Sequence, residues 1–331
     1  MEQQTLGRTG VEVAALAFGC GAVGGLMVRG DAKGQARAVA RALEAGMNYF
    51  DTAPSYGDGA SETNLGRALR EVGQPDRQLV IATKVRVEPA DMTEPGPAIR
   101  RSLEASLKRL GRDHVELLHL HNAIGAYDDP GGASVPTAAA LDQVAEGLRR
   151  LVNDGLAEHI GFTAVGETPA LLQLAEHPRY ETAQAYVNVL NASGIKPGAS
   201  GGQQDFGGFV THAAERGIGV IAIRVYAAGA LTATAARHPI ASLPPRPLVP
   251  GSDYEQDVSR ARSIEELARE FGCENGLEFG LRFALSAPGI ATALVGLSTY
   301  EHLEYAIRWA ERGRLPDAAF QRVLDLQARA G

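Results

Sequence analysis

Short apolar runs typical of β-strands alternate with helical patterns along the whole chain. The runs lie at residues 15–19, 48–52, 79–85, 115–120, 158–163, 182–188, 219–225 and 292–296. A helical pattern follows each run, most clearly where Leu141, Val144, Leu148 and Leu151 recur on one face before Gly155. Several runs are apolar almost throughout, as in parallel strands that are covered on both faces. Eight such units predict an α/β fold with a closed (β/α)8 arrangement, a TIM barrel.

The length of 331 residues would by itself suggest two domains of about 150 residues. Because the alternation is continuous, we instead expect a single barrel domain over residues 1–331, within the size range of such barrels. Residues 5–13, with Gly7-Arg8-Thr9-Gly10 between apolar residues, predict an N-terminal β-hairpin at one end of the barrel.

Three long segments follow predicted strands, at residues 122–137, 192–205 and 233–257. The loops after the strands lie at the C-terminal face of a barrel, where active sites are built. We therefore expect these segments to wall a substrate pocket, with Tyr127, Phe206 and Tyr254 as their aromatic side chains.

The charge and composition exclude several classes of protein. The formal net charge is −7 and no cluster of lysine and arginine stands out, which argues against a nucleic-acid or anionic-membrane surface. Two cysteines cannot form a disulfide framework, and the first ten residues lack the features of a secretory leader. No run reaches the roughly 18 apolar residues of a membrane span. We expect a cytoplasmic protein.

Four polar residues lie at or near the ends of successive predicted strands. Asp51 ends the second strand and Tyr56 follows it, Lys84 lies near the end of the third, and His121 directly follows the fourth. In a barrel these side chains converge on one rim. A tyrosine keeps its proton until about pH 10, but an adjacent ammonium is expected to lower that pKa. Asp51 would keep Lys84 charged, and His121 would orient a carbonyl oxygen by hydrogen bonding. The pattern predicts proton-transfer chemistry.

Two other interpretations of these regions are weaker. The segment Gly19-Cys20-Gly21-Ala22-Val23-Gly24 fits the dinucleotide fingerprint G-x-G-x-x-G, but it does not open directly into a helix as that motif requires. His119 and His121 point to the same side of a strand, as in metal-dependent hydrolases. Further metal ligands are missing from later strand ends, so we expect no metal.

The sequence resembles the aldo-keto reductase family. The resemblance is carried by residues 50–57, Phe-Asp-Thr-Ala-Pro-Ser-Tyr-Gly, by Ser61-Glu62 and Leu65-Gly66, and by Lys84 and His121 in matching order and spacing. It implies a carbonyl reductase that depends on NAD(P)H, built on a (β/α)8 barrel. In that family the residue at the position of Tyr56 is the general acid, and the residue at the position of Lys84 lowers its pKa. The resemblance implies that Asp51 pairs with this lysine and that His121 orients the carbonyl.

The resemblance also implies positions that contact the cofactor. They are Gly21, Ala22, Asp51, Thr163, Gln184, Arg224, Val225, Tyr226, Gly229, Leu231, Gly296, Ser298 and His302. Gln184 fits the glutamine that holds the nicotinamide amide, whereas Thr163-Ala164 stands where the family usually has Ser-Asn. Residues 224–231 resemble the segment that covers the pyrophosphate in some branches.

The region implied to bind the adenosine 2′-phosphate lacks the basic residues common in the family. Gly296 and His302 stand where many members have a lysine and an arginine, although a dianionic phosphate favours charged donors. Ser298 and His302 lie beside a helix N-terminus, which also favours anions. We expect NADP(H), with NAD(H) as the alternative.

Two alternative functions remain open. The Gly296 pattern also resembles family members that act as NAD-dependent aldose dehydrogenases. A nicotinamide-binding regulatory subunit of a channel-like partner is the alternative from another class. In either enzyme the expected partner is a small carbonyl or sugar substrate, and the sequence carries no signal for an oligomeric state.

Overall fold

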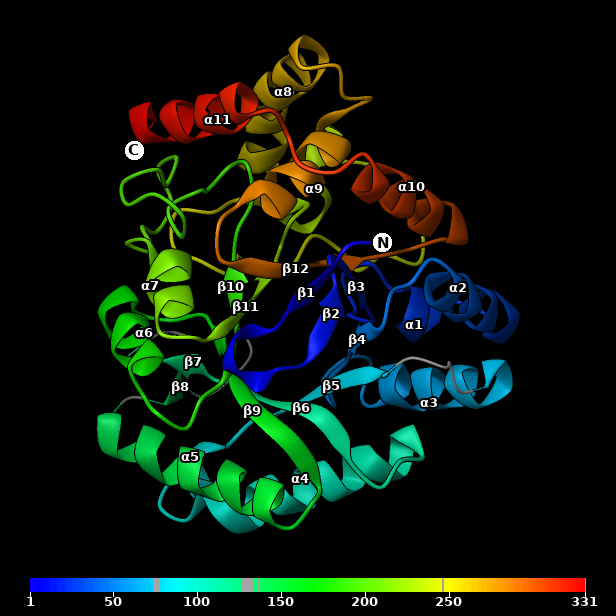
Figure 1. Cartoon of the computed structure of the whole chain (residues 1–331), viewed down its shortest axis with the longest axis vertical. Coiled ribbons are helices and arrows are strands. Elements are labelled where there is room, and N and C mark those ends of the chain that lie inside the picture. The colour runs from blue at the N-terminus through cyan, green and yellow to red at the C-terminus, as the bar shows by residue number, and fades with distance from the viewer. Residues whose placement is uncertain (74–77, 127–133, 136, 246, 331) are drawn as a thin grey trace.

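The computed structural model describes all residues except 74–77, 127–133, 136, 246 and 331. Eight parallel strands in this part of the chain form one closed barrel (Figure 1). They are β3 (Leu16–Gly19), β4 (Tyr49–Asp51), β5 (Val80–Val85), β6 (Val115–Leu120), β9 (Ala157–Ala164), β10 (Thr182–Tyr186), β11 (Gly219–Ile223) and β12 (Ile290–Gly296). They neighbour one another in chain order, and β12 pairs with β3 to close the barrel. The predicted fold is confirmed.

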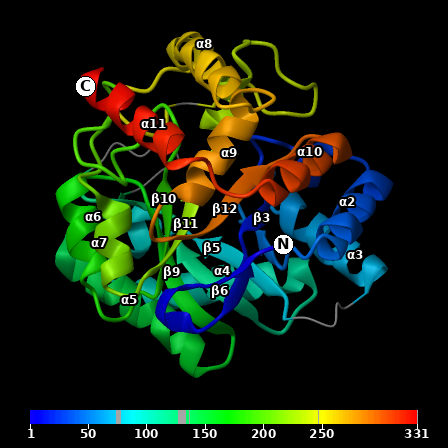
Figure 2. The same cartoon turned by 45° about the horizontal axis from the view of Figure 1, so that its top comes forward.

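Helices surround the strands on the outside (Figures 1 and 2). They are α1 (Leu26–Arg29), α2 (Ala32–Glu44), α3 (Ala60–Val72), α4 (Pro95–Leu110), α5 (Ala138–Asn153), α6 (Thr168–Ala175), α7 (Phe209–Glu215), α8 (Tyr254–Glu270), α9 (Gly276–Ser286), α10 (Tyr300–Glu311) and α11 (Asp317–Arg329). Side-chain caps begin several of them, since Thr137 accepts from Ala140 N and Asn275 from Glu278 N. No described helix combines the length and apolar composition that crossing a membrane requires.

The predicted hairpin is present at the N-terminal end of the barrel. Strands β1 (Gln3–Thr5) and β2 (Glu12–Ala14) are antiparallel, with a short 3-10 helix η1 (Gly7–Thr9) between them. Leu6 and Val13 are buried in one cluster with side chains from inside the barrel, such as Ile221. The hairpin therefore covers this end.

The long segments after the strands are partly ordered into small elements. The loop after β6 contains β7 (Ala123–Ile124) and β8 (Ser134–Val135), which pair in parallel, and Tyr127 lies outside the described residues. Residues 192–205 contain no helix or strand. The 3-10 helices η2 (Pro89–Asp91) and η3 (Ala227–Thr232) follow β5 and β11, and a loop leads from η3 to α8.

This last loop reaches across to the segment that follows β3. Ser242 N donates to the Val23 carbonyl at 3.2 Å, and Arg29 Nε donates to the Ile240 carbonyl at 2.6 Å. The two loops thereby form one wall of the C-terminal face.

Candidate active site

The four predicted catalytic residues come together because their strands are neighbours. Strands β4, β5 and β6 are adjacent, Asp51 pairs in register with Ala82, and Lys84 pairs with His119. Tyr56 lies in the turn between β4 and α3. The carboxyl ends of these strands thus bring together residues that are 70 positions apart.

Lys84 is the centre of this arrangement. Its Nζ is 2.5 Å from Asp51 Oδ1, donates to the Thr52 carbonyl at 2.9 Å, and lies 3.2 Å from Tyr56 OH. The rings of Tyr56 and His121 meet edge to face, with centroids 5.9 Å apart. Tyr56 and His121 line the cavity, while the side chain of Lys84 is fully buried behind them.

The protonation states follow from burial and from the ion pair. Burial alone would lower the pKa of Lys84, but the charge of Asp51 and the contact with Tyr56 raise it above its usual value. Burial raises the pKa of Asp51, which the contact with Lys84 opposes. Lys84 therefore remains an ammonium in the ion pair.

The neighbouring ammonium lowers the pKa of Tyr56, as expected, but burial has the larger and opposite effect. Burial raises the pKa of Tyr56 above its usual value of 10.0, and Lys84 only limits that increase. Tyr56 thus carries its proton at neutral pH and is suited to donate it. Burial lowers the pKa of His121 well below 6.5, with Lys84 and Arg86 adding to the effect, so its imidazole is neutral.

The cavity beside these residues has a volume of about 400 Å³. Most of the other predicted site residues line it: Gly21, Thr163, Gln184, Arg224, Val225, Tyr226, Gly229, Gly296, Ser298 and His302. Ala22 and Leu231 do not. Leu231 is fully buried, and a Cβ added at Gly280 of α9 would lie 2.5 Å from its side chain.

Two polar side chains form the floor of the cavity near Asp51. Gln184 Nε2 donates to Asp51 Oδ2 at 2.5 Å, and Thr163 pairs with Gln184 in the register of β9 and β10. The buried Thr163 hydroxyl has no hydrogen-bond partner among the described residues. An unpaired buried hydroxyl is costly, and its position in the cavity makes it available to a ligand.

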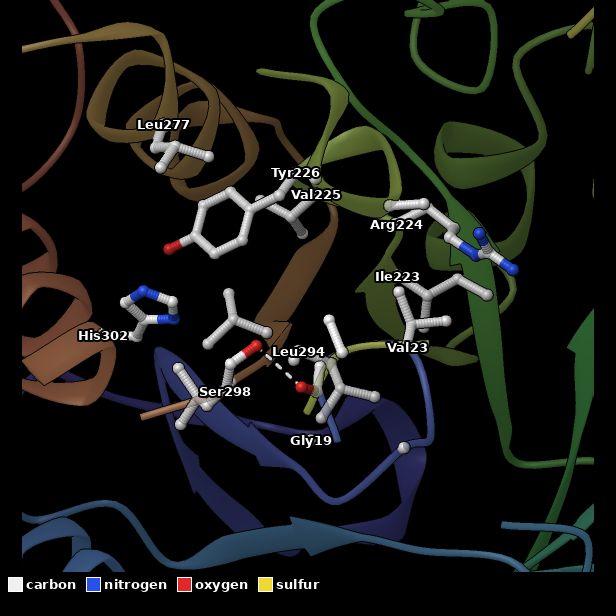
Figure 3. Close-up of a pocket in the computed structure, with 18 of the residues that line it drawn as sticks. Gly19, Val23, Ile223, Arg224, Val225, Tyr226, Leu277, Leu294, Ser298 and His302 are labelled. Carbon is white, nitrogen blue, oxygen red and sulfur yellow. Dashed lines mark hydrogen bonds between the residues drawn. The ribbon is translucent and has the colours of Figure 1, made fainter. Parts of the chain in front are cut away.

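The opposite end of the cavity lies at α10 (Figure 3). Ser298 Oγ donates to the Gly24 carbonyl at 2.7 Å, and the Thr299 side chain caps α10 by accepting from His302 N. The ring of His302 lies 6.1 Å from that of His238. Partial burial lowers the pKa of His302, and His238 adds to the effect, so the neutral imidazole is favoured at neutral pH.

Sequence reasoning missed several residues of the cavity wall. Arg237, His238 and Leu277 all line it. Tyr254, which was expected in the pocket wall, lines it too, and Arg237 Nη1 donates to the Ala228 carbonyl at 2.7 Å and to Tyr254 OH at 2.9 Å. The length of the 233–257 segment and its position after a strand identified the loop, but no pattern selected Arg237 or His238. Phe206 is buried and stacks on Tyr186, outside the cavity lining.

The histidine pair considered for metal binding is differently arranged. His119 is fully buried and its Nε2 lies 2.8 Å from Thr182 Oγ1. Burial lowers its pKa to about 3. Of the described residues, one group of His114, Glu116 and Glu158 could hold a metal ion, but Arg112 already pairs with Glu116 at 2.6 Å.

The fold and this site match a known class of protein. Residues 15–328 match the Aldo/keto reductase family, and the chain belongs to that family. The family consists in general of carbonyl oxidoreductases that depend on NAD(P)H.

Individual relatives agree with this family assignment. L-galactose dehydrogenase from Arabidopsis thaliana is 31% identical over 169 residues, which span 50% of this chain and only 49% of that protein. The uncharacterized oxidoreductase YrpG from Bacillus subtilis (strain 168) is 27% identical over 94% of this chain and 91% of its own length. The solved structure of aldo-keto reductase AKR11C1 from Bacillus halodurans (holo form) has a TM-score of 0.71 at 21% identity, covering 100% of this chain and 97% of that one. It shares the fold.

Proposed function

We propose that this protein reversibly reduces aldehyde or ketone carbonyls to alcohols, with Tyr56 as the proton donor. The observation that carries the proposal is the position of Lys84 Nζ, within hydrogen-bond distance of both Asp51 and Tyr56. Tyr56 and His121 face the cavity side by side, which suits two groups that act on the same oxygen.

The chemical roles follow from the protonation states. When bound, the nicotinamide supplies a hydride to the carbonyl carbon. Tyr56 donates its phenolic proton to the carbonyl oxygen, which completes the alcohol. Lys84, 3.2 Å away, stabilises the phenolate that remains, and Asp51 holds this ammonium in place. His121 is neutral and orients the carbonyl oxygen through a hydrogen bond.

The residues that line the cavity fit a nicotinamide dinucleotide. The free hydroxyl of Thr163 and the Gln184 side-chain oxygen suit the carboxamide, next to the Asp51 ion pair. Gly21 leaves room there, since a Cβ added to it would lie 3.7 Å from the Tyr56 ring. Val225, Tyr226 and Gly229 would lie over the pyrophosphate, with Ala22 and Leu231 holding the surrounding backbone.

The adenosine end would contact Gly296, Ser298 and His302. We propose that the protein binds NADP(H), as the family resemblance favours, and also accepts NAD(H). His302 is the predicted side chain that could become charged there for a 2′-phosphate, although burial disfavours its charged form. The Ser298 hydroxyl donates its proton to Gly24 and is left with acceptor capacity.

Replacing Tyr56 tests the proposal directly. The Tyr56→Phe variant should lose about 10²- to 10⁴-fold in kcat/KM for a neutral aldehyde such as methyl 4-formylbenzoate, because only the proton donor is removed. Binding of NADPH, followed by quenching of protein fluorescence, should change less than about threefold. Tyr180→Phe is the matched control, since Tyr180 is buried far from the cavity lining and its hydroxyl lacks a partner in the described structure. Retained turnover in Tyr56→Phe would rule out the assignment.

An NAD-dependent aldose dehydrogenase is the second candidate. It is favoured by the similarity to a protein named L-galactose dehydrogenase and by Gly296 at the adenosine end. Oxidation requires Tyr56 as phenolate, so its rate should rise with pH because burial raises the pKa of Tyr56. Turnover of aldoses with NAD⁺ that exceeds aldehyde reduction would favour this candidate. Cofactor binding without turnover in either direction would favour the regulatory-subunit alternative.

A further inference from the structure

Arg224 lies at the end of β11 in an unusual backbone conformation. Its φ is +59°, a left-handed value that residues other than glycine rarely adopt. The side chain lines the cavity beside Ile223. Such conformations persist where the surrounding structure holds them, and they cluster at binding sites.

The guanidinium of Arg224 has no hydrogen bond or ion pair with any residue that the structure describes. Partial burial of the side chain lowers its pKa. The side chain is half-buried in the cavity wall, and an arginine placed there without a partner is well suited to pair with a carboxylate or phosphate of a ligand. The Arg224 guanidinium is therefore available to pair with an anionic group of a ligand.

A carboxylate of the protein that shares a cavity with Arg224 already has other partners. Asp257 shares a small cavity with Arg224, but its carboxylate accepts from Gln203 Nε2 at 2.8 Å and from Ser252 Oγ at 2.9 Å. It also pairs with Arg260 at 3.3 Å. Asp257 is therefore satisfied without Arg224.

The direction of the Arg224 side chain indicates which part of a ligand it would contact. In Figure 3 the Arg224 side chain extends away from His302 and the adenosine end. Its charge acts on the phenols of Tyr56 and Tyr186, so it lies at the catalytic end of the cavity. The segment 225–231 remains available to the pyrophosphate through its backbone.

We infer that the side chain of Arg224 binds a carboxylate of the substrate, so that the preferred substrates are carbonyl compounds that also carry a carboxylate group. This inference rests on the proposed function and adds the substrate class. The guanidinium would fix the acid while Tyr56 and His121 hold the carbonyl oxygen, which positions the reacting carbon. The competing possibility is that Arg224 binds a cofactor phosphate.

Matched aldehydes test the inference. 4-Carboxybenzaldehyde and methyl 4-formylbenzoate present the same carbonyl with and without a negative charge. The wild-type protein should prefer the acid by about tenfold or more in kcat/KM, a difference typical of one charged contact. Arg224→Met should abolish this preference and Arg224→Lys should keep part of it. Arg262→Met, on the exposed face of α8, is the control and should leave the ratio unchanged.

A binding experiment separates this inference from the proposed function. Benzoate and the neutral benzamide are titrated by calorimetry into the protein loaded with NADP⁺, and Arg224→Met should lose affinity for benzoate alone by about tenfold. That loss of benzoate affinity would support the inference whether or not the aldehydes are reduced. If neither aldehyde were reduced, the proposed function would be refuted, but not the inference. Wild-type preference for the ester would overturn the inference. The inference would also be overturned if Arg224→Met bound NADP⁺ at least tenfold more weakly but kept the wild-type ratio of kcat/KM for the acid and the ester. Arg224→Lys provides the same comparison if the Met variant does not fold.

Discussion

Gln184 Nε2 donates to Asp51 Oδ2, while Asp51 Oδ1 holds Lys84 Nζ. The glutamine assigned by resemblance to the nicotinamide thus also fixes the carboxylate of the catalytic ion pair. The proposed cofactor contact and the proposed proton transfer therefore share one buried hydrogen-bond network, in which removal of one member affects the others.

Thr163→Val should weaken cofactor binding without destabilising the protein. The Thr163 hydroxyl has no partner among the described residues, so valine, which has nearly the same shape, removes a buried polar group at no cost in hydrogen bonds. We expect the dissociation constant of NADPH to rise about five- to tenfold, with the melting temperature equal or higher.

Thr292→Val provides the matched control for this substitution. The Thr292 hydroxyl is also buried in the barrel and lacks a partner in the described structure, but it does not line the cavity. It should change neither cofactor binding nor turnover. Unchanged NADPH binding in Thr163→Val would remove Thr163 from the proposed cofactor site.

Lys84→Met should reduce both stability and activity. It leaves the Asp51 carboxylate buried without its cation, which costs about 3–5 kcal/mol in the free energy of unfolding. The double variant Asp51→Asn/Lys84→Met should regain much of this stability in urea unfolding, but not the activity. If the double variant were as unstable as the single one, an uncompensated charge would not be the cause.

The preference between NADPH and NADH should depend on pH. A 2′-phosphate favours charged His302, whose pKa is lowered by burial and by His238 and raised in part by Glu301. The relative affinity for NADPH should therefore rise as the pH falls from 8 to 6, by about three- to tenfold. Fluorescence titration of both cofactors measures this change, and His302→Gln should flatten it. A ratio independent of pH in the wild-type protein would exclude His302 as the phosphate ligand.

The barrel and the convergence of the four proposed catalytic residues could be predicted from sequence because both depend on regular features. Parallel strands have fixed directions, so Asp51, Lys84 and His121 at strand ends converge whatever the loops do. Helix α11 was not predicted because its apolar positions, such as Val323 and Leu324, follow the last strand and complete no further strand-helix unit.

The rest of the site depends on contacts that no local pattern specifies. His238 meets His302 only after a long loop has crossed the cavity, and Arg237 binds backbone carbonyls of two different segments. The effect of Lys84 on the pKa of Tyr56 can be predicted from sequence, whereas the sign of the net shift depends on how fully the phenol is buried. Sequence spacing shows the neighbouring charge but not the extent of desolvation.

The two halves of the chain contribute different parts of the proposed site, and the closure of the barrel brings them together. Asp51, Tyr56, Lys84 and His121 all belong to its first half, whereas most of the proposed cofactor contacts belong to its second half. The two halves meet at the cavity where Gly19 pairs with Gly296, and a Cβ added at Gly19 would lie 2.6 Å from the Val295 carbonyl oxygen. A side chain at this seam would push the halves apart, so the absence of side chains here keeps the proposed proton donor close to the proposed nucleotide site.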